Sequence, residues 1–173
     1  MQKAIFNIQN ETDFERCALQ VFKHQFENNK VYRSFCDLLY IHPSDVKEVA
    51  QIPFLPIQFF KTHQVLSTNQ SVQETFTSSG TTGAQVSKHL VADVSWYEAS
   101  YTKAFEHFYG PIEDYTVLGL LPNYLEREGS SLIYMVNDFI HKSNNPKSGF
   151  YLDNLSELTK TLIALDQKGE KVL

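Results

Sequence analysis

The pattern of hydrophobic and polar positions predicts helices over the first sixty residues. Apolar residues recur every three or four positions in two stretches, as they do on the buried face of an amphipathic helix. In the first stretch these residues are Phe14, Cys17, Ala18, Val21, Phe22 and Phe26, and in the second Val31, Tyr32, Phe35, Cys36, Leu38 and Leu39. A capping box at Thr12-Asp13-Phe14-Glu15 predicts the start of the first helix. Residues 52–57 contain two prolines and are predicted to form an extended apolar segment packed along the body.

From residue 65 onward, short apolar runs separated by turns favour strands. We expect two short strands, Val65–Thr68 and Val72–Phe76, around a turn at 69–71, and another strand at Ser87–Val91. The box Ser95-Trp96-Tyr97-Glu98 predicts the start of a helix, and Gly110-Pro111 its end. Its expected inner face consists of Tyr97, Tyr101, Ala104, Phe105 and Phe108.

The remaining residues alternate between strand and helix patterns. The nearly continuous apolar run Tyr115–Leu121, ended by Pro122, is typical of a buried parallel strand. A helix is expected next, and a short strand at Phe150–Leu152. A last helix should begin at an Asn154 cap and end near Gly169. The inward residues are expected to be Leu132, Ile133, Met135, Val136, Phe139 and Ile140 in the first of these helices, and Leu158, Leu162, Ile163 and Leu165 in the second.

Strand–helix alternation predicts an α/β fold, with an N-terminal helical region packed on a partial, mainly parallel sheet with crossover helices. We place the helical region at residues 1–62 and the α/β region at 63–173. The final residues, Glu170–Leu173, have the pattern of a strand that is beginning, so we expect the chain to be part of a longer protein.

Composition and charge narrow the class of protein. The chain has 173 residues and a net charge of −5, without a basic cluster, which argues against a nucleic-acid binder. It has no apolar run of membrane-spanning length and no secretory signal at its start, so a cytoplasmic location is expected. Cys17 and Cys36 fall on predicted core faces, which favours buried, reduced thiols.

The candidate chemistry lies in Thr77-Ser78-Ser79-Gly80-Thr81-Thr82-Gly83, where every residue is Thr, Ser or Gly. Glycine lets a backbone approach a ligand closely, successive N–H groups form an anion nest, and hydroxyls donate to phosphate oxygens. Lys88 supplies a positive charge nearby. The spacing is that of neither a Walker A loop nor a dinucleotide fingerprint. A flexible Ser/Thr/Gly linker is the alternative, and the position between two strand patterns favours a functional turn.

This loop resembles the phosphate loop of the adenylate-forming superfamily, which includes acyl-CoA synthetases. Residues 52–56 with Phe60-Lys61 before it, and Leu121-Pro122-Asn123-Tyr124 and Gly129–Ile133 after it, are similar to the acyl-protein synthetase branch. That branch supplies activated fatty acid to the reductase of bacterial bioluminescence. The resemblance spans roughly residues 30–152. It implies that ATP and a carboxylate form an acyl adenylate, and that the acyl group then passes to a thiol of a protein or of CoA.

By this resemblance, Thr77–Gly83 contact the β- and γ-phosphates of ATP, usually with Mg²⁺, and Lys88 is a further candidate contact. The family pattern continues as Gly-x-Pro-Lys, whereas this chain has no proline there and places its lysine later, at Lys88. The adenine and metal motifs, the catalytic lysine and the acyl-accepting cysteine of the family lie beyond the end of this sequence. The resemblance therefore implies the N-terminal part of such an enzyme, inactive alone.

Other candidates are weaker. Asn123 and Tyr124 follow a predicted parallel strand, where ligands often bind, and they fit a substrate pocket or a plain turn equally well. Ser130 lacks the Gly-x-Ser-x-Gly context of a nucleophile and is expected to cap a helix. His107 and His141 are expected to be solvated residues, because no metal-ligand set accompanies them.

Two alternative functions stay open at this point. The first is an acyl-CoA ligase, which shares the chemistry and differs in the thiol acceptor. The second is a non-catalytic fragment that acts as an interaction domain.

Overall fold

The computed structural model describes residues 2–78, 85–121 and 128–173, and the chain divides into two compact units, residues 1–96 and 97–173. Helices and short sheets are both present, as expected of an α/β protein. The boundary between residues 62 and 63 that the sequence suggests stays a prediction. None of the helices in the described ranges is long and apolar enough to cross a bilayer.

Helices α2 and α3 form the core of the first unit. The helical elements of this unit are α1 (Gln2–Ile5), α2 (Glu11–Asn28), α3 (Lys30–Leu38), η1 (Val49–Gln51) and α4 (Phe59–Thr62). The buried core residues are Phe22, Phe26, Tyr32, Cys36 and Val46. Both cysteines of the chain are buried and free, as predicted.

Helix α2 begins two residues earlier than the capping box predicts. Its cap is Asn10, whose Oδ1 accepts a hydrogen bond from the Asp13 N–H at 3.0 Å. Thr12 lies inside the first turn, so the prediction of a cap at Thr12 was wrong. Asn is at least as good a cap as Thr, so a start at Asn10 loses nothing in capping relative to a start at Thr12.

Replacing Asn10 with alanine is expected to destabilise the first unit by about 0.5–2 kcal/mol, because the Asp13 N–H loses its acceptor. Thr12→Ala provides the matched control, since Thr12 is exposed and is not the cap. Urea denaturation of both variants measures the difference. A larger loss for Thr12→Ala than for Asn10→Ala would contradict the assignment of the cap.

Asn29 separates α2 from α3. Its backbone is extended, its N–H donates to the Gln25 carbonyl and closes α2, and its side chain accepts from the Tyr32 N–H at 3.1 Å to open α3. At the C-terminal end of α3, Leu38 and the cap residue Leu39 are exposed, which corrects the prediction that they face the core. The helical spacing of apolar residues continues through Leu38 and Leu39, although Cys36 is the last residue of α3 in the buried core.

The proline-containing segment 52–57 contains no helix or strand, and its first residue, Ile52, has an extended backbone. Ile52 and Leu55 pack against the core of the first unit. Phe54 and Ile57 are largely exposed, so only part of the segment packs along the body.

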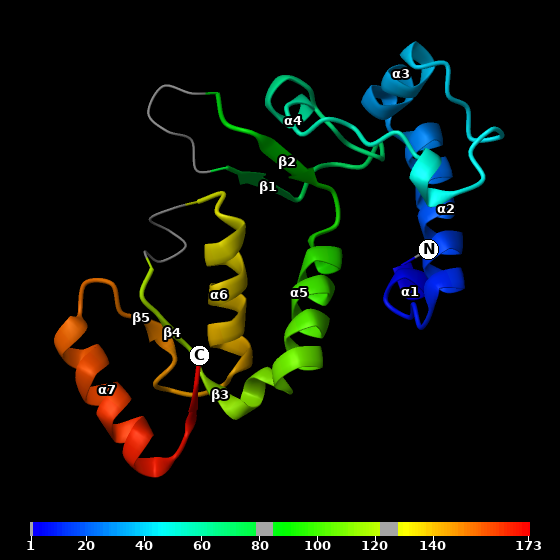
Figure 1. Ribbon diagram of the computed structural model, residues 1–173. Helices are drawn as coiled ribbons and strands as arrows, with labels where there is room; N and C mark the ends of the chain where they lie inside the picture. Colours follow the sequence, from blue (N-terminus) through cyan, green and yellow to red (C-terminus); the bar gives the residue numbers. More distant parts are fainter. Residues whose placement is uncertain (1, 79–84, 122–127) are drawn as a thin grey trace. The chain divides into compact units, whose positions relative to one another are not determined.

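A β-hairpin completes the first unit. Strand β1 (Glu74–Thr77) pairs antiparallel with β2 (Lys88–Val91), from Glu74 opposite Val91 to Thr77 opposite Lys88; Figure 1 shows the two strands side by side. The prediction of a strand at Val65–Thr68 was wrong, since this segment is irregular. The partner of β1 is thus the strand that follows the hydroxyl-rich loop.

Helix α5 (Val94–Tyr109) begins directly after Asp93, earlier than the predicted Ser95 box would place its start. The Asp93 carboxylate accepts from the Ser95 N–H at 3.1 Å and from the Ser95 hydroxyl at 2.6 Å. The helix ends before Gly110, whose φ of +85° favours glycine. On the predicted inner face, Ala104 and Phe108 are exposed, which corrects that part of the prediction.

Parallel strands organise the second unit. After η2 (Ile112–Asp114) come β3 (Tyr115–Thr116), β4 (Leu118–Gly119), α6 (Ser131–Lys142), β5 (Gly149–Phe150), α7 (Leu155–Lys168) and β6 (Lys171–Val172). Strand β3 pairs parallel with β6, and β4 pairs parallel with β5. Because β3 and β4 are consecutive, β5 and β6 lie on either side of one extended segment, as the backbone hydrogen bonds Gly149 N–H to Val117 O and Leu173 N–H to Thr116 O confirm.

The crossover helices α6 and α7 connect these parallel strands, as the alternating pattern predicts. In Figure 1 strands β4 and β5 lie between these two helices. Successive right-handed crossovers that run in opposite directions place their helices on opposite faces of a sheet. The packing is close at Gly119, since a Cβ there would lie 3.0 Å from Phe150 Cδ1 and 3.2 Å from Val136 Cγ1, and these side chains would have to shift to admit it.

The caps of these helices match the sequence expectations. Ser130 caps α6 and Asn154 caps α7, each by accepting from the N–H three residues on, and Gly169 ends α7 in the left-handed conformation. The inner faces are narrower than predicted, because Leu132, Leu162 and Ile163 are exposed. The buried residues are Ile133 and Phe139 in α6 and Thr161 and Leu165 in α7.

Candidate functional site

The hairpin brings the first residues of the hydroxyl-rich loop, Thr77 and Ser78, next to Ser87 and Lys88. Thr77 and Lys88 are paired across β1 and β2, and both are exposed. Immediately beyond them, the Ser78 N–H donates to the Ser87 carbonyl at 3.1 Å, and the Ser78 Oγ accepts from the Ser87 N–H at 3.0 Å. The predicted contacts Thr77, Ser78 and Lys88 therefore share one end of the hairpin.

The side chain of Ser78 helps to hold the end of the hairpin together. Its oxygen accepts the hydrogen bond from Ser87, which leaves the hydroxyl proton for donation to a ligand. The other predicted loop contacts, Ser79–Gly83, lie outside the described residues, as do the candidate pocket residues Asn123 and Tyr124.

A polar groove of about 600 Å³ lies between α4 and the hairpin. Lys61 and His63 line it from the α4 side, and Gln85 and Lys88 line it from the hairpin side. Gln85 Nε2 donates to the Lys61 carbonyl at 2.7 Å and so joins the two sides. Its described lining contains two lysines and no carboxylate, which favours an anion.

The sequence pattern alone did not identify the groove. Lys61 follows a proline-rich segment and lies 27 positions before Lys88. Only the pairing of β1 with β2, together with the Gln85 contact, brings α4 to the end of the hairpin. A basic residue close to a hydroxyl-rich loop is the one signal that the sequence contained.

Cys36 is fully buried, and burial raises the pKa of its thiol. Burial also raises the pKa of the neighbouring Tyr32, whose hydroxyl donates to the Pro53 carbonyl at 2.7 Å. The thiolate is the reactive form of cysteine, and a raised pKa keeps the thiol protonated. Cys36 is therefore suited to packing in the core and not to nucleophilic chemistry.

Tyr101, Asp138 and Lys142 form a polar network in the second unit that connects two helices. The Tyr101 hydroxyl donates to Asp138 Oδ2 at 2.6 Å, and Lys142 Nζ lies 2.6 Å from the same oxygen. Burial, followed by the hydrogen bond to Asp138, raises the pKa of Tyr101. A phenol that is held protonated and bonded in this way fixes α5 against α6.

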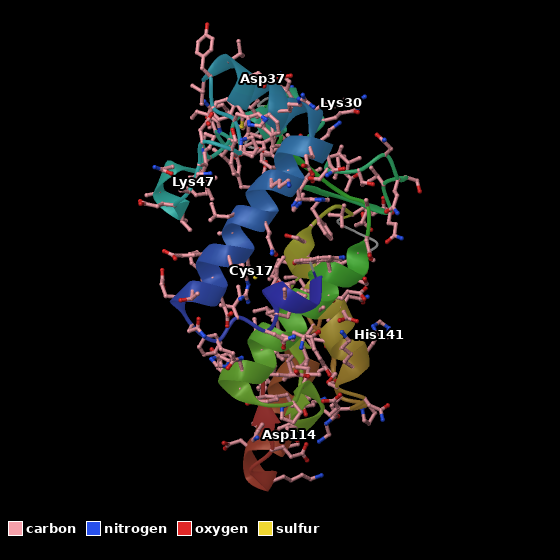
Figure 2. The ribbon with its side chains drawn as sticks, turned by 90° about the vertical axis from the view of Figure 1, so that its right-hand side faces the viewer. Cys17, Lys30, Asp37, Lys47, Asp114 and His141 are labelled. Carbon is pink, nitrogen blue, oxygen red and sulfur yellow. The ribbon has the colours of Figure 1, made fainter. Side chains whose placement is uncertain are left out.

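Ser130, His107 and His141, which the sequence analysis considered as weaker candidates, lie as expected at a helix cap and on the protein surface. Ser130 caps α6 and is not placed as a nucleophile. His107 and His141 are exposed, and Figure 2 labels His141 on α6. Within the described ranges, no group of three or more His, Cys, Asp and Glu residues is arranged to hold a metal ion.

Comparison with known proteins adds independent findings. The family model described as "Acyl-protein synthetase, LuxE" matches residues 4–102, which is more than half of the chain and includes the hydroxyl-rich loop and both strands of the hairpin. The long-chain-fatty-acid–luciferin-component ligase of Photorhabdus luminescens is 30% identical over 70 residues. These residues are 40% of this chain and 60% of that protein, so the match spans less than two thirds of the relative. No solved structure matches the chain.

Proposed function

The chain belongs to the LuxE acyl-protein synthetase family, and from this premise we propose that it takes part in the ATP-dependent activation of a fatty acid and its transfer to a thiol. The observation that carries the proposal is that the family match includes Thr77–Gly83. This segment lies between two paired strands, and Thr77, its first residue, is paired with Lys88. The name of the Photorhabdus relative, a ligase for long-chain fatty acids, supports the choice of substrate.

The chemistry requires two group transfers. A carboxylate oxygen forms a bond to the α-phosphorus of ATP, and the bond to pyrophosphate breaks. A thiol sulfur then attacks the acyl carbon, AMP leaves with the carboxylate oxygen, and the thiol proton passes to solvent. We assign this chain to the first transfer, because it carries the residues suited to holding the leaving phosphates.

The residues that hold the phosphates are proposed from the geometry of the hairpin and the groove. Thr77 and the Ser78 hydroxyl stand at the end of the hairpin, and Lys61 and Lys88 line the groove beside it. Fixed donors and cations of this kind stabilise charge as it develops on a leaving group. We assign no Mg²⁺ ligand to the described residues, which offer no acidic cluster. The two buried free cysteines support a cytoplasmic setting.

Fatty-acid-dependent exchange of labelled pyrophosphate into ATP tests the first transfer in the native protein that carries this chain. Exchange that requires a long-chain acid is the expected result, because adenylate formation is reversible. Absence of exchange with every carboxylic acid would reject the proposal. A labelled acid then identifies the acceptor: label on a protein supports the acyl-protein synthetase, and label on CoA supports the ligase alternative.

A further inference from the structure

The first unit contains an apolar cavity of about 830 Å³, separate from the predicted phosphate loop. Its walls come from α1 and α2, from segments 49–55 and 65–68, and from 89–96. Small and medium apolar side chains such as Cys17, Ala18 and Val21 line it from α2, and Figure 2 labels Cys17 there. The volume lies in the upper part of the range of roughly 300–1,000 Å³ that is typical of small-molecule sites.

Several polar side chains in the cavity wall already have hydrogen-bond partners within the protein. The Ser67 hydroxyl donates to Gln25 Oε1 at 2.5 Å, and the Asp93 carboxylate accepts from Ser95. The Tyr32 hydroxyl donates to the backbone of Pro53. Because these side chains are already hydrogen-bonded within the protein, they do not require a polar ligand. An apolar ligand can therefore fill the cavity without breaking any of these hydrogen bonds.

The cavity meets the polar groove at Phe60 and Leu90, which line both. Along β2, Lys88 lines the groove and His89 lines the cavity, as expected of successive side chains on opposite faces of a strand. The His89 ring lies 6.0 Å from the ring of Phe60. An apolar chamber therefore adjoins a basic groove at one edge, and the groove reaches the end of the hairpin.

We propose that this cavity binds the alkyl chain of the acid substrate, with the carboxylate at the Phe60–Leu90 edge, facing Lys61 and Lys88. The inference rests on the proposed function for the identity of the ligand as a long-chain carboxylic acid. It adds the location of the acyl site in the N-terminal unit, between α2 and the hairpin. The arrangement matches an amphipathic ligand, with an apolar wall for its tail and cations for its head.

Chain-length dependence of binding tests the site in the native protein, without ATP. Straight-chain acids displace bound cis-parinaric acid, a fluorescent fatty acid, and the affinity is expected to rise about fourfold per methylene until the cavity is filled. Ala18→Phe, which adds a ring inside the cavity, should weaken hexadecanoic acid by about tenfold or more and change octanoic acid by less than about twofold. Ala104→Phe is the matched control, because Ala104 is an exposed helical residue outside the cavity.

The outcomes separate this inference from the proposed function. An affinity that does not depend on chain length, or an equal loss in Ala18→Phe and Ala104→Phe, overturns the acyl site even if pyrophosphate exchange is normal. Chain-length-dependent binding without exchange rejects the activation reaction and keeps the site. If the melting temperature shows that Ala18→Phe is misfolded, Val21→Ala widens the cavity instead. That variant should extend the rise in affinity to longer acids, and an unchanged limit overturns the proposal.

Discussion

Replacing Thr81 and Thr82 with alanine is expected to lower the rate of adenylate formation by about 10²–10³. The two hydroxyls belong to the segment that the family resemblance assigns to the β- and γ-phosphates. Negative charge grows on these phosphates as the bond to the α-phosphorus breaks, and a donor that is already in place stabilises this charge without reorganisation. Fatty-acid-dependent pyrophosphate exchange in the native protein measures the effect.

The control for this prediction is the double variant Thr12→Ala and Thr159→Ala, which removes two exposed threonine hydroxyls from helices. It should keep an exchange rate close to that of the unmodified protein. Normal exchange in the Thr81→Ala, Thr82→Ala variant would refute the phosphate role of the loop. Binding of the fatty acid should be unaffected in both variants, because the proposed acyl site lies elsewhere.

Phe139→Ala is expected to destabilise the second unit by about 3–5 kcal/mol, the usual cost of removing a buried Phe side chain. Phe139 is only 3% exposed, and its ring centroid lies 5.2 Å from that of Tyr101 and 5.1 Å from that of Phe105. These contacts join α6 to α5. The substitution loses the burial of the ring and leaves a cavity that rigid neighbours fill only in part.

Phe108→Ala is the matched control, since Phe108 lies on α5 and is 75% exposed. Its free energy of unfolding should change by no more than about 0.5 kcal/mol. Urea denaturation followed by circular dichroism measures both variants. Similar losses in the two would contradict the assignment of Phe139 to the core and of Phe108 to the surface.

The sequence predicted best the features that depend on local interactions. Asn154 and Ser130 cap helices because a short polar side chain reaches the N–H three residues on. The prolines of 52–57 keep this segment out of a helix, and Gly110 and Gly169 occur at helix ends with positive φ. The parallel strand after residue 114 was also recognisable, because strands covered on both faces are apolar almost throughout.

The local rules failed where several residues competed for the same position. Asn10 replaced Thr12 as the cap of α2, and Asp93 replaced Ser95 as the start of α5. In both cases a good cap precedes the predicted one, and extending the helix by a turn or less adds backbone hydrogen bonds. Apolar periodicity likewise named Leu38, Phe108 and Ile163 as inward residues, although all three are exposed.

By itself, the sequence determined the alternation of strands and helices and the family resemblance, because each is encoded in consecutive residues; the phosphate role of the loop stays a prediction. Only the tertiary structure decided that β1 pairs with β2, since pairing depends on contacts between segments that are distant along the chain. The same pairing places Lys88 across from Thr77, and the contact of Gln85 with α4 brings Lys61 to the groove. Burial of a given apolar residue was decided in the same way, because a periodic pattern specifies a face of a helix and only a packed neighbour covers it.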